Sequence, residues 1–288
     1  MIPGAFAPWY TELLETTMFM GVTEVNKRTG VQIKVYPYGG VSGIFSLKQP
    51  YNLPITRLRK LYPASAAAEL MWFLKGSKDI TWFRKYSTFW NKFVEADGKT
   101  VANAYGYRWR AHFGRDQIEK VITSLRDDTT SRQVVVCAWD PAVDGLGNTA
   151  KNVPCPAMFN FVIINGQLCS SLFIRSSDIV LGLPYDIMGH ALLTGLIARE
   201  LNVSFGTLHV TLGHAHIYER HYDAVSKMLN QYSMSEFGQY TSGPMLPPHT
   251  LMEACACPDE YIFYMSELAK EWSALKPATF SPKLDIVV

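Results

Sequence analysis

The sequence has little charge and no long apolar run. Only 18% of its 288 residues are charged, against roughly 25% in ordinary soluble domains. The 27 Lys and Arg residues nearly balance the 25 Asp and Glu residues, which leaves a formal net charge of +2. Such a balance does not favour a dedicated nucleic-acid partner. Apolar segments such as 158–164 stop well short of the ~20 residues that cross a bilayer, so we expect no membrane partner.

Two further absences concern location and metals. The N-terminal segment lacks a basic stretch followed by an apolar one, so we expect no secretory signal and a cytoplasmic protein. The five cysteines are an odd number and form no CxxC pair, which argues against a disulfide framework and a zinc ribbon. His214 and His216 alternate, but no third ligand stands at a recognisable spacing. We therefore expect no metal.

No internal repeat, low-complexity tract or long linker divides the chain. We therefore expect one catalytic domain over residues 1–288. Helical spacing of apolar residues predicts helices over 10–21, 63–76 and 184–201.

Extended segments alternate with turn signals in the second half of the chain. Residues 133–140, 158–164 and 167–175 have the composition of strands, and the last two flank Asn165-Gly166, a strong hairpin signal. Residues 207–218 are predicted to form one strand. Helices and strands do not alternate regularly, so the pattern predicts an α+β fold.

Cys155 is the candidate nucleophile. It lies between two prolines at the start of a predicted strand, and Arg175 follows at the far end of the hairpin. The hairpin brings the cation back toward the thiol, and a nearby cation increases the thiolate fraction. A buried structural thiol is the alternative interpretation.

Several ordered motifs, taken together, resemble the thymidylate synthase family from about residue 10 to 225. They comprise NKRTG (26–30), AAELMWFLKG (67–76), AYGYRWR (104–110), TTSRQVVVCAWD (129–140), VPC (153–155), RSSDIVLGLPYDIMGHALLTGLIA (175–198) and LGHAHIYERH (212–221). An ordered set of motifs is far more specific than any single one. The resemblance implies a single-domain α+β fold in which a large mixed sheet is packed by helices and one sheet face forms a homodimer interface.

The resemblance also implies the chemistry. Cys155 would add to C6 of a pyrimidine nucleotide, so that C5 can attack the methylene carbon of the co-substrate 5,10-methylenetetrahydrofolate. Glu69 would organise the proton transfers, and Tyr105 would assist near C5. Asp186 would read the base.

The remaining site residues are also implied by the family. The 5′-phosphate would be held by Arg28, Arg132, Arg175 and Ser176, and Arg132 would reach across from the partner subunit. His216 and Tyr218 would hold the ribose. The positions of Gln133, Asn160 and Asp178 also match the nucleotide site. The folate would contact Trp90, Asp178, Leu181, Gly182 and Tyr185, and the C-terminal segment ending at Val288 would close over it.

Four matched positions depart from the family pattern. Asp186 replaces the Asn that reads uracil, Pro156 replaces a His, Gln133 replaces an Arg, and Asn160 replaces a Gln. A carboxyl suits the 4-amino group of cytosine and, when protonated, can also donate to N3. The pattern therefore resembles the cytidylate hydroxymethylase branch, acting on dCMP or CMP.

Several alternatives stay open. The chain could methylate dUMP or cytidylate, or it could be a non-catalytic nucleotide-binding relative. Cys155 with His214 or His216 could form a hydrolase dyad, although no local signature supports one. Asp186 could also be retained only because a carboxylate is favourable in the first turn of a helix.

Overall fold

The structure is a computed structural model that describes residues 3–27, 29–48, 53–145, 147, 150–234 and 244–275. Its helices are α1 (Phe6–Met20), α2 (Pro63–Leu74), α3 (Tyr105–Tyr107), α4 (Gln117–Asp127), α5 (Leu183–Glu200), α6 (Tyr222–Met234), α7 (Leu251–Ala256) and α8 (Pro258–Leu275). Its strands are β1 (Val22–Val25), β2 (Gln32–Val35), β3 (Val41–Ser46), β4 (Val135–Cys137), β5 (Pro156–Ile164), β6 (Gln167–Ile174), β7 (Ser177–Asp178), β8 (Ser204–Leu212) and β9 (Ala215–Tyr218).

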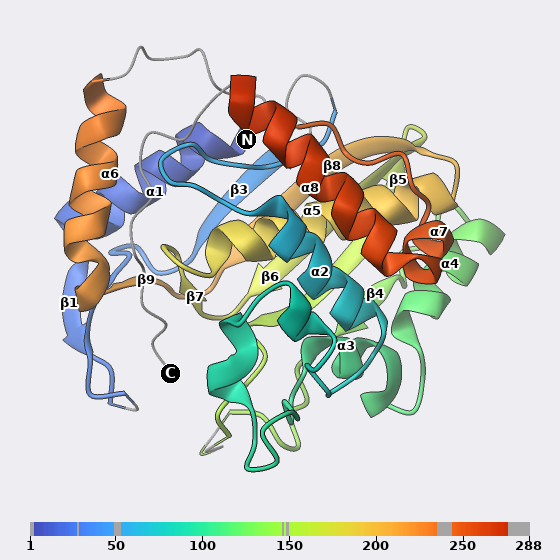
Figure 1. Cartoon of the computed structure of the whole chain (residues 1–288), viewed down its shortest axis with the longest axis horizontal. Helices are drawn as coiled ribbons and strands as arrows, with labels where there is room; N and C mark the ends of the chain where they lie inside the picture. The colour runs from blue at the N-terminus through green and yellow to red at the C-terminus, as the bar shows by residue number, and fades with distance from the viewer. Residues whose placement is uncertain are drawn as a thin grey trace.

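The strands form two mixed sheets. The larger has the order β3-β8-β6-β5-β4, with β6 and β8 parallel and the other pairs antiparallel. The smaller has the order β1-β2-β9-β7. Helix α5 packs on the larger sheet, α2 packs on α5, and α8 packs on α2, as Figure 1 shows. This confirms the α+β fold and its large mixed sheet packed by helices; the second sheet was not anticipated.

The predicted helices and hairpin are confirmed within a few residues. Helix α5 begins with Pro184 in its first turn, where a proline is tolerated, and most of its side chains are buried. The hairpin between β5 and β6 turns at Asn165 and Gly166, which both have positive φ, 51° and 69°, as a tight two-residue turn requires. The hairpin places the start of β5 beside the end of β6, where the site lies.

The prediction of one strand over 207–218 is wrong. The chain leaves the larger sheet after Leu212, turns at Gly213 and His214, and enters the smaller sheet at Ala215. A Cβ at Gly213 would lie 3.0 Å from the carbonyl oxygen of Arg175, which explains why a glycine stands at this crossing. Gly213 and His214 therefore connect the two sheets, close to the candidate nucleophile Cys155.

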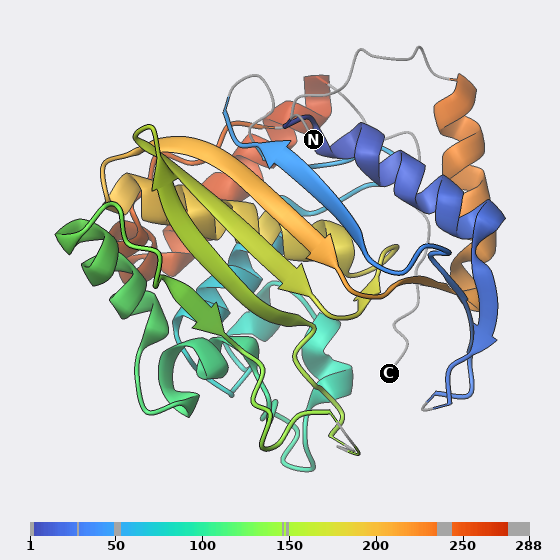
Figure 2. The same cartoon turned by 180° about the vertical axis from the view of Figure 1, so that it is seen from behind.

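One face of the five-stranded sheet carries no described helix (Figure 2). Side chains in β5 alternate, so Phe159 and Phe161 point into the core while the residues between them point away from it. Val135, Met158 and Phe173 are 47%, 42% and 38% exposed on this open face. We refer to this surface as the open sheet face.

Candidate active site

A cavity of about 670 Å³ lies where β5 begins, β6 ends and α5 begins. It brings together most of the residues predicted from the sequence. These are Glu69, Trp90, Tyr105, Cys155, Arg175, Ser176, Asp178, Leu181, Gly182, Tyr185, Asp186, His216 and Tyr218. They come from α2, α3, α5, the smaller sheet and the loops at the ends of β5 and β6, so the fold gathers side chains that lie far apart in the sequence.

The other predicted site residues are not brought into this cavity. Arg132 and Gln133 are exposed just before β4. Asn160 lies on the open sheet face, because the alternation along β5 turns it away from the core-facing Phe159. Arg28 and Val288 lie outside the described residues.

Cys155 and Arg175 meet as the hairpin predicts. Nη2 of Arg175 lies 3.9 Å from the Sγ atom of Cys155. The guanidinium is fixed there because Nε donates to the carbonyl of Pro154 at 2.8 Å and Nη2 donates to that of Val153 at 2.9 Å. A cation held at this distance stabilises a thiolate, so the geometry suits Cys155 to nucleophilic attack.

Arg175 is also packed against Trp139, with its guanidinium carbon 5.3 Å from the ring centroid. Behind Trp139, the chain turns at Gly145, where a Cβ would lie 2.8 Å from the indole ring. A flat aromatic face and a guanidinium attract one another. The turn after β4 therefore holds Trp139 against the cation that faces the thiol.

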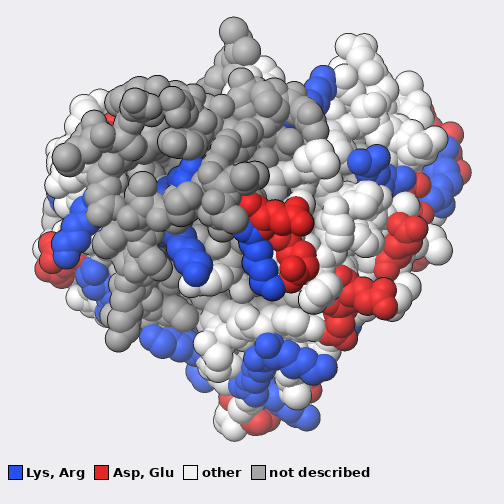
Figure 3. All heavy atoms as spheres, turned by 45° about the horizontal axis from the view of Figure 1, so that its top comes forward, with Lys and Arg blue, Asp and Glu red and all other residues white. Residues whose placement is uncertain are grey.

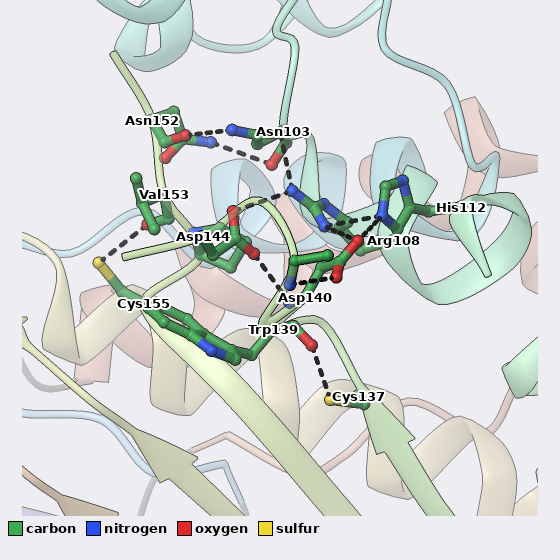
Figure 4. A network of polar contacts seen from close by, with 12 residues as sticks. Asn103, Arg108, His112, Cys137, Trp139, Asp140, Asp144, Asn152, Val153 and Cys155 are labelled. Carbon is green, nitrogen blue, oxygen red and sulfur yellow. Dashed lines mark hydrogen bonds and ion pairs between the residues drawn. The ribbon is translucent and has the colours of Figure 1, made fainter. Parts of the chain in front are cut away.

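A buried ion network supports this turn (Figure 4). Arg108 is 1% exposed; its Nη2 lies 3.0 Å from Oδ1 of Asp144 and donates to Oδ1 of Asn103 at 2.8 Å. Its Nη1 lies 3.6 Å from Oδ2 of Asp140, which is also 2.6 Å from Nε2 of His112. The hydrogen bond from His112 is the largest cause of a lowered pKa at Asp140. Arg108 thereby ties the turn containing Asp140 and Asp144 to the core.

Glu69 projects from α2 into the cavity. Oε1 of Glu69 accepts a hydrogen bond from the indole nitrogen of Trp90 at 2.5 Å. Burial raises the pKa of Glu69 to about 7, and the Trp90 hydrogen bond opposes part of that rise. A carboxyl with this pKa can both give and take a proton near neutral pH.

Asp186 and Tyr105 stand beside Glu69. Burial raises the pKa of Asp186 well above the usual range of a carboxyl, and the neighbouring Glu69 and Asp178 add to the rise. Burial also raises the pKa of Tyr105, whose hydroxyl accepts a 3.4 Å hydrogen bond from the backbone nitrogen of Cys155. Tyr105 therefore stays a neutral phenol, and Asp186 favours the neutral acid.

His216 and Tyr218 line the cavity from β9. Nδ1 of His216 lies 3.3 Å from Nδ1 of His214, and burial lowers the pKa of His216 to about 4, so its ring is neutral. Oδ1 of Asp178 accepts from the backbone nitrogens of Val180 and Leu181, both at 3.0 Å. Asp178 therefore shapes the turn before α5, and its Oδ2 lies 4.0 Å from Nδ1 of the buried His221.

Several residues that line the cavity were not predicted from the sequence, among them Arg59 and Trp139. Arg59, 5% exposed, donates through Nη2 to the carbonyls of Val180 and Leu181 at 3.0 and 3.2 Å, and its guanidinium carbon lies 5.7 Å from the Tyr185 ring centroid. Trp139 was noted only as part of a motif. The basic run RLRK around Arg59 was the available signal.

Neither a metal site nor a membrane-spanning helix competes with this cavity within the described part of the chain. Among the described residues, no three His, Cys, Asp or Glu side chains converge as metal ligands, and no described helix is long and apolar enough to span a membrane. On the face shown in Figure 3, described basic and acidic side chains lie in small separate groups among uncharged residues.

The fold and cavity define a protein that presents a cysteine thiol, an arginine and two buried carboxyls to the interior of one cavity. A sequence profile described as Thymidylate synthase matches residues 9–241, most of the chain. The chain therefore belongs to the thymidylate synthase family. This family carries out folate-dependent one-carbon transfer to a pyrimidine nucleotide, with methylenetetrahydrofolate as co-substrate.

Proposed function

We propose that this protein transfers a one-carbon unit from 5,10-methylenetetrahydrofolate to C5 of a cytidylate, dCMP or CMP, and releases the 5-hydroxymethyl nucleotide. The observation that carries this proposal is the carboxyl of Asp186 on the cavity wall, with its raised pKa. The family pattern has an asparagine here to read uracil.

A neutral carboxyl matches the hydrogen-bonding edge of cytosine. Its carbonyl oxygen accepts from the 4-amino group, and its O–H donates to N3. Uracil presents the opposite pattern, an acceptor at O4 and a donor at N3. The raised pKa of Asp186 fits cytosine, since the neutral carboxyl supplies both the donor that N3 needs and an acceptor for the 4-amino group, whereas an ionised carboxylate would supply acceptors only.

In the proposed reaction, the thiolate of Cys155 adds to C6 and makes C5 nucleophilic. C5 attacks the methylene carbon of the folate, loses its proton and expels tetrahydrofolate, which leaves an exocyclic methylene. Water adds to that methylene and gives up a proton, and the electron pair returns to the ring as the Cys155 thiolate leaves C6. Glu69 and Tyr105 are positioned in the same cavity to move the protons.

The phosphate is assigned to Arg175 and Ser176. Nε and Nη2 of Arg175 are occupied by backbone carbonyls, whereas Nη1 makes no hydrogen bond to a described residue. One edge of the guanidinium therefore remains for an anion.

The remaining residues keep the roles that the family resemblance implies. His216 and Tyr218 are assigned to the ribose. The folate side is assigned to Trp90, Asp178, Leu181, Gly182 and Tyr185. Arg28 and Arg132 keep their proposed phosphate roles, and Gln133 keeps its proposed place at the nucleotide site. For Asn160, its place on the open sheet face argues against a role next to the base.

Asp186→Asn tests the proposal. An asparagine amide satisfies O4 and N3–H of uracil, so kcat/KM for dCMP and CMP should fall while that for dUMP rises. A site built for one hydrogen-bond pattern can discriminate by a factor on the order of 10⁴, and we expect the ratio of the kcat/KM values to shift by at least about tenfold.

An unchanged ratio would show that Asp186 serves only the first turn of α5, where a carboxylate is favourable. The protein would then methylate dUMP like an ordinary family member. Release of dihydrofolate distinguishes methylation, of dUMP or of cytidylate, from hydroxymethylation. Methylation consumes a hydride from tetrahydrofolate, whereas hydroxymethylation does not. A non-catalytic relative would bind nucleotide but form no product from dCMP, CMP or dUMP.

A further inference from the structure

A second, much smaller cavity lies behind the wall of the first. Glu69, Tyr105, Tyr185 and Asp186 line both cavities and so form the partition between them. The small cavity has about 30 Å³ of room for the centres of water-sized spheres, and about 10–15 Å³ suffices for one water molecule. Its lining also includes the buried side chain of His190.

His190 has a buried nitrogen with no partner. The side chain is 5% exposed, and its Nε2 makes no hydrogen bond to any described residue. Its ring packs between Phe159 and Phe161, with centroids 4.9 and 5.9 Å away. Burial lowers the pKa of His190 to about 3, so the imidazole is neutral. A buried polar atom of this kind is satisfied by ordered water in most proteins.

Asp186 points into the same space from one turn earlier. The two residues are four positions apart on α5, so their side chains lie on one helix face. The carboxyl of Asp186 receives no hydrogen bond from a described residue, and burial favours its neutral form. A water molecule that donates to the carbonyl oxygen of this carboxyl can complete the link to His190 and leave the O–H of the carboxyl to face the base.

Gly189 keeps the space open. It lines the small cavity, and a Cβ placed on it would meet no atom within 4 Å. Glycine is unfavourable inside a helix compared with alanine, so α5 gives up helix stability at a position where a methyl group would fit. The room beside His190 thus depends on the missing side chain.

We propose that the small cavity holds ordered water that links Nε2 of His190 to the carboxyl of Asp186, and that His190 is a positioning residue that keeps this carboxyl as a donor facing the base. The water site stands on the cavity and the unpartnered nitrogen alone. The base-reading role rests on the proposed function.

The test compares Gly189→Ala and His190→Phe with two matched variants. Gly189→Ala fills the space with a methyl group, and His190→Phe keeps the ring but removes the nitrogen. His190→Gln returns a polar atom near the position of Nε2, and Gly195→Ala makes the glycine change in the same helix, where the Cβ would lie 3.3 Å from Cδ1 of Leu246, outside the small cavity.

A crystal structure of the free wild-type protein should show a water oxygen within hydrogen-bond distance of Nε2 of His190, and Gly189→Ala should lack it. In steady-state kinetics, Gly189→Ala and His190→Phe should each lower the cytidylate-to-dUMP ratio of kcat/KM by about tenfold, the equivalent of one hydrogen bond. His190→Gln should recover most of the ratio, and Gly195→Ala should keep it.

A dry cavity in the wild-type crystal structure would overturn the water site. A water that is present, with the ratio unchanged in Gly189→Ala and His190→Phe, would overturn the positioning role. Equal losses in His190→Phe and His190→Gln would also overturn that role, because they would indicate packing alone. If the wild type turns over only dUMP, the proposed function fails while the crystal structure still decides the water site.

Discussion

Glu69 has a carboxyl in a place that disfavours its charge. Among the described residues its side chain accepts a hydrogen bond from the Trp90 indole, a neutral donor, and burial outweighs that bond and raises the pKa of Glu69 to about 7. Keeping an ionised carboxyl here costs stability, which is a common feature of groups that must exchange protons.

Glu69→Gln should therefore stabilise the protein in a pH-dependent way. Below the usual pKa of 4.5 the carboxyl is protonated in both the folded and the unfolded states, so it imposes no penalty. As pH rises toward 7, the unfolded chain ionises first and the wild type loses stability, whereas the glutamine variant does not. The difference in the free energy of unfolding should grow by on the order of 2–3 kcal/mol across this window.

Urea denaturation of both proteins at several pH values measures this difference, and activity should be low in the variant throughout. A difference that stays the same from pH 4.5 to 8 would contradict the raised pKa. The substitution removes only the ionisation of the side chain, because the amide oxygen of glutamine can still accept the hydrogen bond from Trp90.

At the residue scale, local pattern predicted some contacts and missed others. The approach of Arg175 to Cys155 followed from one hairpin, because an Asn-Gly turn fixes the register of its strands. The pairing of Arg108 with Asp144 could not be predicted from a local pattern, because it joins a helical turn to a loop 36 residues later. No periodicity in the sequence relates two such positions.

At the scale of elements, the turn after β4 is anchored by the buried guanidinium of Arg108, which pairs with Asp140 and Asp144 in that turn. Arg108 lies in the turn Arg108–His112, which has π-helical hydrogen bonding, a geometry that is frequent at functional sites. The side chain of Asp144 is fully buried against it. Removing one partner of such a pair leaves an unpaired buried charge.

Arg108→Met should cost about 3–5 kcal/mol of unfolding free energy. Arg110→Met is the matched control, because Arg110 pairs with Asp116 at 2.6 Å but is 29% exposed, and such pairs contribute about 0–1 kcal/mol. Chemical denaturation compares the two. Equal losses in the two variants would contradict the anchoring role of Arg108.

Element predictions succeeded where hydrophobic periodicity was local. Helices α1, α2 and α5 and the β5–β6 hairpin were found this way. The strand break at Gly213 was missed because apolar residues alternate on both sides of it, in β8 and again at Ala215 and Ile217, and the shift in phase by one residue at the break was overlooked. At this break Gly213 lies close to the backbone of Arg175. The two residues are far apart in the sequence, so no local pattern predicts their contact.

For the whole molecule, the open sheet face is the surface that remains to be explained. Its exposed apolar side chains, Val135, Met158 and Phe173, lie next to one another across β4, β5 and β6. We propose that two copies of the chain meet there and that the exposed Arg132 reaches the phosphate site of the partner.

Mixing two inactive variants tests the shared site. Arg132→Ala and Cys155→Ala homodimers should each be nearly inactive. A heterodimer should recover part of the activity, because one of its two sites then contains both native residues. An active monomer in sedimentation, or no recovery after subunit exchange, would contradict the dimer.

The central claim is that the product is a hydroxymethylated cytidylate. Its most direct test is mass spectrometry of the nucleotide after incubation of the wild-type protein with methylenetetrahydrofolate and, separately, dCMP, CMP and dUMP. We expect a cytidylate to gain the mass of CH₂O, with no dihydrofolate formed and dUMP converted poorly. A gain of CH₂ on dUMP, accompanied by dihydrofolate, would contradict the claim.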